Sequence, residues 1–87
     1  MDTSAIRAAL KHARAVLNSM HYDVLAAYAT VRRLKRLAPP HMEPIALQAE
    51  AAVMTSMEYR SKDNDAVARY ALTKLIGAME HAHLRVV

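Results

Sequence analysis

The sequence predicts an all-α domain, and three observations support this fold class. An apolar residue recurs at alternating steps of four and three for ten consecutive positions, the spacing that keeps one helix face apolar. Neither glycine nor proline interrupts this run. The chain also contains 18 alanines but no Phe, Trp or Cys, a composition that favours closely packed helices. The ten positions, called the apolar stripe below, are Ile6, Leu10, Ala13, Leu17, Met20, Val24, Ala27, Val31, Leu34 and Ala38.

The first element is predicted as one long helix over about residues 4–37. Thr3 or Ser4 is expected to cap it, because either hydroxyl can accept hydrogen bonds from the free N–H groups of the first turn. Pro39 and Pro40 end it, since proline disfavours helical geometry in the preceding residue and has no N–H. At about 1.5 Å per residue, such a helix is roughly 50 Å long.

Two shorter helices are predicted over about residues 44–60 and 65–84. Pro44 suits the first position of a helix, where its missing N–H costs nothing. An Asp or Asn of the polar run 61–65 is expected to cap the last helix. Gly77 lies inside that helix and predicts close packing by a neighbouring element. The last helix repeats the four-three spacing at Ala68, Leu72, Leu75, Met79, Ala82 and Val86.

An internal similarity gives an alternative organisation. Residues 23–29 and 65–71 share Asp, Ala, Tyr and Ala in register. If this is a true repeat, the first helix is kinked or broken near residues 18–22, Asp23 caps a new helix, and the chain forms two helical hairpins. Such a four-helix bundle resembles tetratricopeptide repeats, although the glycines and most large residues of that family are missing. The unbroken apolar phase through residues 17–24 favours the continuous helix.

Composition limits the class of protein. Residues 1–87 form one domain, and a domain of this size has a thin core. Without cysteine there is no disulfide, thiolate metal site or cysteine nucleophile. The amino terminus lacks the features of a signal peptide, and no stretch approaches the roughly 18 apolar residues of a membrane span. We therefore expect a cytoplasmic protein without membrane contact.

The length of the predicted first helix also predicts a homodimer. Helices of about 17 and 20 residues are roughly 25 to 30 Å long and cannot cover a helix of twice that length. The first helix is apolar over most of its circumference, because Ala8, Ala15, Tyr22 and Ala29 form a second apolar line. Such a helix needs neighbours on several sides. A second copy, packed antiparallel, is the simplest neighbour.

The positive charge of the chain gathers on the first helix. The formal net charge is +4, and residues 1–37 contain seven Lys or Arg against two acidic residues. The cations follow the four-three spacing, displaced by one residue from the apolar stripe. A solvated face, with cations opposing the helix dipole in the last turn, explains the same pattern. The candidate binding surface comprises Arg7, Lys11, Arg14, His21, Tyr28, Arg32, Arg33, Lys35 and Arg36.

No catalytic residue, metal site or cofactor is predicted. The histidines include no pair at the i, i+4 spacing of a helical zinc site: they are His12, His21, His41, His81 and His83. Capping and pairing with the arginines of the first helix account for the carboxylates.

Three functions are compatible with these patterns. The first is a small non-catalytic interaction module of the regulator, inhibitor or chaperone type, which binds a protein partner through the apolar and basic first helix. The second is binding of nucleic acid or another polyanion through the basic line, with an affinity that falls steeply with salt. The third is a small enzyme, because a long helix with two shorter ones in a dimer resembles the helical chorismate mutases. By this resemblance, Arg7 and Lys35 of this chain would hold a dicarboxylate. The family has a further arginine in the middle of its long helix, and this chain has no counterpart to it near Val24.

Overall fold

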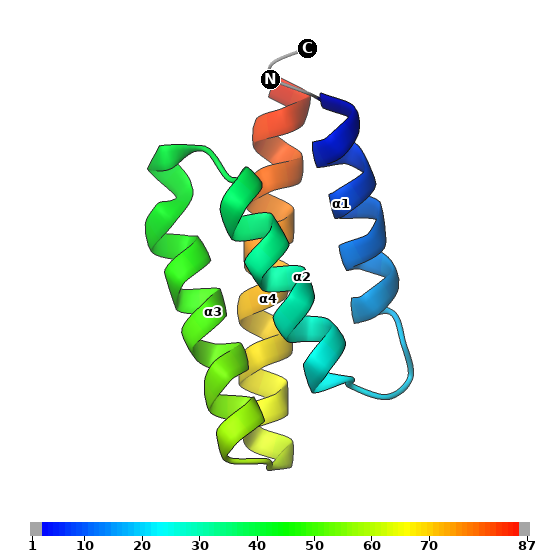
Figure 1. Cartoon of the computed structure of the whole chain (residues 1–87), viewed down its shortest axis with the longest axis vertical. Coiled ribbons are helices and arrows are strands. Elements are labelled where there is room, and N and C mark those ends of the chain that lie inside the picture. Colours follow the sequence, from blue (N-terminus) through cyan, green and yellow to red (C-terminus); the bar gives the residue numbers. More distant parts are fainter. Residues whose placement is uncertain (1–2, 86–87) are drawn as a thin grey trace.

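The computed structural model describes the backbone of residues 3–85 and the side chains of residues 4–83. Its helices are α1 (Thr3–Leu17), α2 (Val24–Leu37), α3 (Glu43–Glu58) and α4 (Lys62–Arg85), with a short 3-10 helix, η1 (Pro40–Met42), before α3. Successive helices run in opposite directions, so the α1–α2 and α3–α4 turns lie together at one end of the bundle (Figure 1). The all-α prediction is confirmed.

The prediction of a continuous first helix is wrong. The chain leaves the helix after Leu17 and starts a new one at Val24. Met20 is 91% exposed in this turn, so the apolar phase through residues 17–24 is not a continuous buried face. The longest dimension of the structure is 39 Å, shorter than the roughly 50 Å that a continuous helix needs. Residues 3–85 contain four α-helices, as in the two-hairpin alternative.

Two polar side chains stabilise the break between α1 and α2. The Asp23 Oδ1 atom accepts hydrogen bonds of 3.1 Å each from two N–H groups in the first turn of α2, which caps that helix. The Arg69 Nη2 atom of α4 donates to the carbonyl oxygens of Leu17, at 2.8 Å, and Ser19, at 3.0 Å. These are carbonyls at the end of α1, where helical N–H partners run out. The end of α1 thus depends on a residue 52 positions from Leu17.

Tyr22 holds the same turn against the α3–α4 hairpin. Its hydroxyl lies 2.9 Å from Oγ of the fully buried Ser56, which itself donates to the Val53 carbonyl at 2.8 Å. Because the serine proton is already used, Tyr22 is the donor. The Arg60 guanidinium lies 5.6 Å from the centroid of the Tyr22 ring and binds Asp65 at 2.9 and 3.0 Å. Burial raises the pKa of Tyr22 above its ordinary value.

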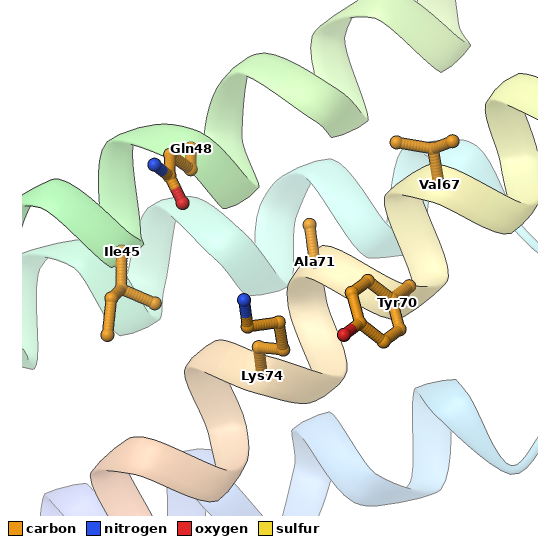
Figure 2. Close-up of a pocket in the computed structure, with 6 residues that line it drawn as sticks. All are labelled: Ile45, Gln48, Val67, Tyr70, Ala71 and Lys74. Atoms are coloured by element: carbon orange, nitrogen blue, oxygen red, sulfur yellow. The ribbon is translucent and has the colours of Figure 1, made fainter.

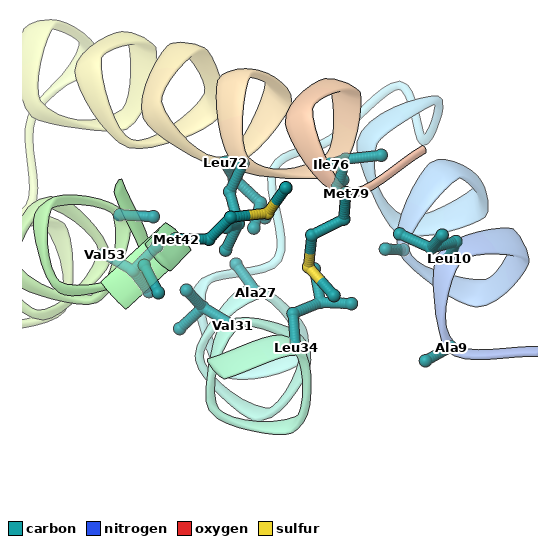
Figure 3. Packing of buried hydrophobic residues seen from close by; sticks show 14 of the residues in the cluster. Ala9, Leu10, Ala27, Val31, Leu34, Met42, Val53, Leu72, Ile76 and Met79 are labelled. Atoms are coloured by element: carbon teal, nitrogen blue, oxygen red, sulfur yellow. The ribbon is translucent and has the colours of Figure 1, made fainter. Parts of the chain in front are cut away.

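The core lies between the four helices (Figure 3). α1 packs on α2 and α4, and α3 packs on α2 and α4. Other helices of the same chain therefore cover both α1 and α2. The mismatch between one long helix and two shorter ones, from which a dimer was predicted, is absent. The buried apolar residues are Ala9, Leu10, Ala13, Ala27, Val31, Leu34, Met42, Ala46, Ala49, Val53, Ala68, Leu72, Leu75, Ile76 and Met79. Five members of the apolar stripe belong to this core.

Three details of the helices also differ from the predictions. The Ser61 Oγ atom accepts the Asn64 N–H at 3.0 Å, so a serine, rather than an Asp or Asn, caps α4, which begins three residues early. A Cβ added at Gly77 would meet no described atom within 4 Å, so the predicted close packing there is wrong. α1 already begins at Thr3, so the residue that would cap it lies outside the described residues, as does Val86. Within residues 3–85 no helix is long and apolar enough to cross a membrane.

Candidate functional site

The turn between α1 and α2 divides the predicted basic line into two rows that face different helices. On α1, the Arg14 guanidinium binds the Glu80 carboxylate of α4 through two hydrogen bonds, the longer of which is 3.2 Å. On α2, the Lys35 Nζ atom binds the Glu50 carboxylate of α3 at 3.0 Å. One row therefore lies along the α4 side of α1 and the other along the α3 side of α2. The single line of charge is not present in the folded chain.

These two ion pairs have a structural role that the sequence could not assign. Each joins one hairpin to the other, α1 to α4 and α2 to α3. The hydrogen bond to Glu80 raises the pKa of Arg14 above its ordinary value. Partly exposed pairs of this kind contribute from about 0 to 1 kcal/mol each. Arg14 and Lys35 are therefore already occupied within the chain.

Five cations of the two helices are exposed and form no ion pair with the residues that the structure describes. Because α1 and α2 are antiparallel, the first half of α1 lies beside the last half of α2 (Figure 1). The five cations consequently share the half of the bundle where α1 begins, with two on the α4 side of α1 and three on α2. We call them the basic face: Arg7, Lys11, Arg32, Arg33 and Arg36.

The remaining predicted residues contribute less to this face. The Arg32 guanidinium lies 5.6 Å from the centroid of the half-buried Tyr28 ring and donates to its hydroxyl at 3.2 Å, so Tyr28 orients one member of the basic face. His21 is exposed in the turn at the opposite end of the bundle. Five of the nine predicted residues thus lie in the half of the bundle where α1 begins, and His21 lies at the opposite end.

Small apolar side chains lie among these cations. Ala8 and Ala15 of α1 and Ala29 of α2 are exposed, and helical register places them on the outer sides of their helices, beside the basic face. Surfaces with apolar side chains at the centre and charges around them are common at protein interfaces. A surface that binds a phosphate backbone needs mainly cations and hydrogen-bond donors.

A second surface, absent from the sequence predictions, lies on the outer side of α3 and α4. A shallow groove of about 140 Å³ runs between the two helices (Figure 2). Val67 and Tyr70 are 59% and 67% exposed beside it, and the Lys74 Nζ atom lies 5.6 Å from the centroid of the Tyr70 ring. A sequence signal exists, because Asp63, Val67, Tyr70 and Lys74 follow a four-three-four spacing of their own. The groove is lined by Ile45, Gln48, Val67, Tyr70, Ala71 and Lys74.

The structure bears on metal and small-molecule binding at these surfaces. Within the described residues, no group of three or more His, Asp or Glu could hold a metal ion. The groove is smaller than the roughly 300–1,000 Å³ of most ligand sites, and Lys74 is the one charged residue in its lining. The break after Leu17 also removes the long helix on which the likeness to chorismate mutases rests, since Arg7 and Lys35 lie on different helices.

No protein-family model, curated protein or solved structure matches this chain.

Proposed function

We propose that this protein is a small non-catalytic helical module that binds an acidic partner protein through the basic face. One observation carries the proposal: α1 and α2 contain seven Lys or Arg and no Asp or Glu, and five of these cations are exposed in the half of the bundle where α1 begins. Their positive potential would steer an acidic surface toward the module. By occupying that surface, the module would act as a regulator, inhibitor or chaperone.

The arrangement of the cations favours a protein over a nucleic acid as the partner. A phosphate backbone presents regularly spaced charges, and the row of cations that would match them is broken at residues 18–23. Two of its members, Arg14 and Lys35, are bound to carboxylates of this chain. The exposed alanines beside the basic face, Ala8 and Ala29, offer apolar contact that protein interfaces use. The cytoplasm remains the compartment that the sequence predicts.

A photo-crosslinking experiment tests this function in the source cells. A photoreactive amino acid replaces Ala8 in one variant and Ala29 in another, because both positions are exposed beside the basic face. We expect illumination to give a protein adduct at each position. Combining either probe with Arg7→Glu and Arg33→Glu should abolish the adduct, since the two substitutions reverse charge at exposed positions without breaking an ion pair among the described residues.

The control is Lys62→Glu, which makes one charge reversal of the same kind at an exposed position at the other end of the bundle. It should leave the adduct in place. Adducts that nuclease removes would show nucleic-acid binding, and this result would refute a protein partner. In that case the affinity for nucleic acid would also fall steeply with salt. Absence of any adduct, or a protein adduct that survives both substitutions on the basic face, would also refute the proposal.

A further inference from the structure

The outer side of α4 carries an exposed stripe that none of the other described helices covers. Its four members are Asp63, Val67, Tyr70 and Lys74, all of them exposed. They follow the four-three spacing of a helix–helix seam, and they point away from the buried residues of the same helix. The two central members are apolar or aromatic and the two outer members are oppositely charged. We call this set the outer stripe.

The outer stripe is complementary to itself when two copies are antiparallel. Its midpoint lies between Val67 and Tyr70. Asp63 precedes this midpoint by about five and a half residues and Lys74 follows it by the same interval, which is about 8 Å along the helix in each direction. A two-fold axis through the midpoint therefore places Val67 opposite the partner's Tyr70 and Asp63 opposite the partner's Lys74. The same axis repeats both contacts, as in all isologous interfaces.

We propose that two copies of this chain form a dimer through the outer stripe of α4, antiparallel and two-fold symmetric. Exposed Tyr and Val side chains form its centre, and two Asp63–Lys74 ion pairs close its ends. The neighbouring groove is too small for most ligands, but its volume of about 140 Å³ admits a side chain from a second helix. Tyr70 is the central contact because large aromatic side chains contribute most at interfaces.

Charge identifies this side of the bundle as the one that accepts a second copy. α1 and α2 contain only cations among their charged residues, so the basic face repels the basic face of another copy. The outer stripe carries one charge of each sign, and antiparallel pairing sets opposite signs against each other. This dimer differs from the one expected from a long first helix. Its surface is the outer stripe of α4, and its reason is charge complementarity, not helix length. It is independent of the proposed function, because no residue of the basic face belongs to the outer stripe.

Sedimentation of the purified protein over concentrations from about 1 μM to 1 mM, the range of weak to moderate affinities, tests the dimer. We expect the mass to rise from 9.7 kDa toward twice that value. Tyr70→Glu should weaken dimerisation at least about tenfold. The matched control is Leu25→Glu, which changes a side chain of similar exposure, 69%, in the first turn of α2. It should leave the dimer unchanged.

An exchange of charges tests the antiparallel register. Lys74→Asp places two carboxylates opposite each other at both ends of the seam, and Asp63→Lys places two ammonium groups there. Each single variant should weaken the dimer, while the double variant should restore it. Circular dichroism checks that every variant keeps its helices. Because Asp63→Lys affects the start of α4 equally in the single and double variants, rescue reports on the interface.

Three results would each overturn the dimer: a 9.7-kDa species at every concentration, a dimer that Tyr70→Glu leaves intact, or a double variant as weak as the single ones. Arg7→Glu with Arg33→Glu separates the two proposals, since it should abolish partner binding and leave self-association intact. A monomer that still gives a partner adduct at Ala8 refutes the dimer alone.

Discussion

Replacing Arg69 by Met should loosen the turn between α1 and α2 and destabilise the whole fold. Met keeps most of the aliphatic length of the arginine side chain but cannot donate a hydrogen bond. The substitution therefore leaves the carbonyl oxygens of Leu17 and Ser19 without the donor that α4 supplies. Water can replace that donor at the more exposed of the two, so the losses are unequal.

The expected cost is about 2 kcal/mol. The bond to Leu17, at 2.8 Å, is partly buried, and a bond from a charged donor in such a place contributes about 1.5 kcal/mol. The bond to Ser19, at 3.0 Å, is exposed and contributes about 0.5 kcal/mol. For a domain of this size, each kcal/mol corresponds to a shift of about 4–8 °C in Tm. Arg69→Met should therefore lower Tm by about 8–16 °C.

Thermal and urea unfolding of Arg69→Met measure this loss. The control is Arg33→Met, which removes an exposed guanidinium that makes no ion pair with the described residues and should change the free energy of unfolding by less than about 0.5 kcal/mol. Hydrogen exchange of the backbone amides in residues 18–23 should also become faster in Arg69→Met. Equal stability of the two variants would refute the role of Arg69 in ending α1.

Three further substitutions test the interior of the bundle. Thr30→Val should stabilise the fold by about 1 kcal/mol in urea unfolding, because the buried Thr30 Oγ1 atom has no partner among the described residues; Thr73→Val, which removes an exposed hydrogen bond to a carbonyl, should give no such gain. Gly77→Ala should raise the free energy of unfolding by about 1 kcal/mol, since the helix gains an alanine and the new Cβ meets no described atom; a loss would reveal a contact at that position. Tyr22→Phe should remove a pH dependence of the free energy of unfolding. Burial raises the pKa of Tyr22 in the folded state. The contribution of Tyr22 to stability is therefore complete below the ordinary tyrosine pKa of about 10 and is lost as the pH rises further. The stability advantage of the natural protein over Tyr22→Phe should narrow above that pH, and a constant difference would contradict this assignment.

The two rows of cations show where prediction from the sequence stops. Composition and spacing identify Arg7, Lys11 and the arginines of α2 as candidates, and each of these residues is exposed as a binding residue must be. Their grouping could not be predicted, because six turn residues change the direction of the chain and reset the helical phase. Arg14 and Lys35 have the same spacing as their neighbours, yet each binds a carboxylate from a distant helix.

The spacing of the outer stripe is visible in the sequence. Asp63 to Lys74 follow a regular spacing, but the stronger buried pattern of Leu72, Leu75 and Met79 lies on the same helix. An apolar residue in a helix can belong to a core or to an exposed surface, and spacing alone does not distinguish the two. The exposure of Val67 and Tyr70 becomes evident only when α3 is placed beside α4.

The helical class, the end of α2 before Pro39 and Pro40, and the apolar spacing along each helix follow from the sequence alone. These features depend on local backbone geometry and on the helical period of 3.6 residues, and both can be recognised within a short segment of sequence. Tertiary structure decided that the first apolar stripe is two shorter seams. Two long-range contacts hold the turn between α1 and α2: Arg69 of α4 donates to the Leu17 and Ser19 carbonyl oxygens, and the Tyr22 hydroxyl bonds Ser56 of α3. No local sequence pattern records either contact.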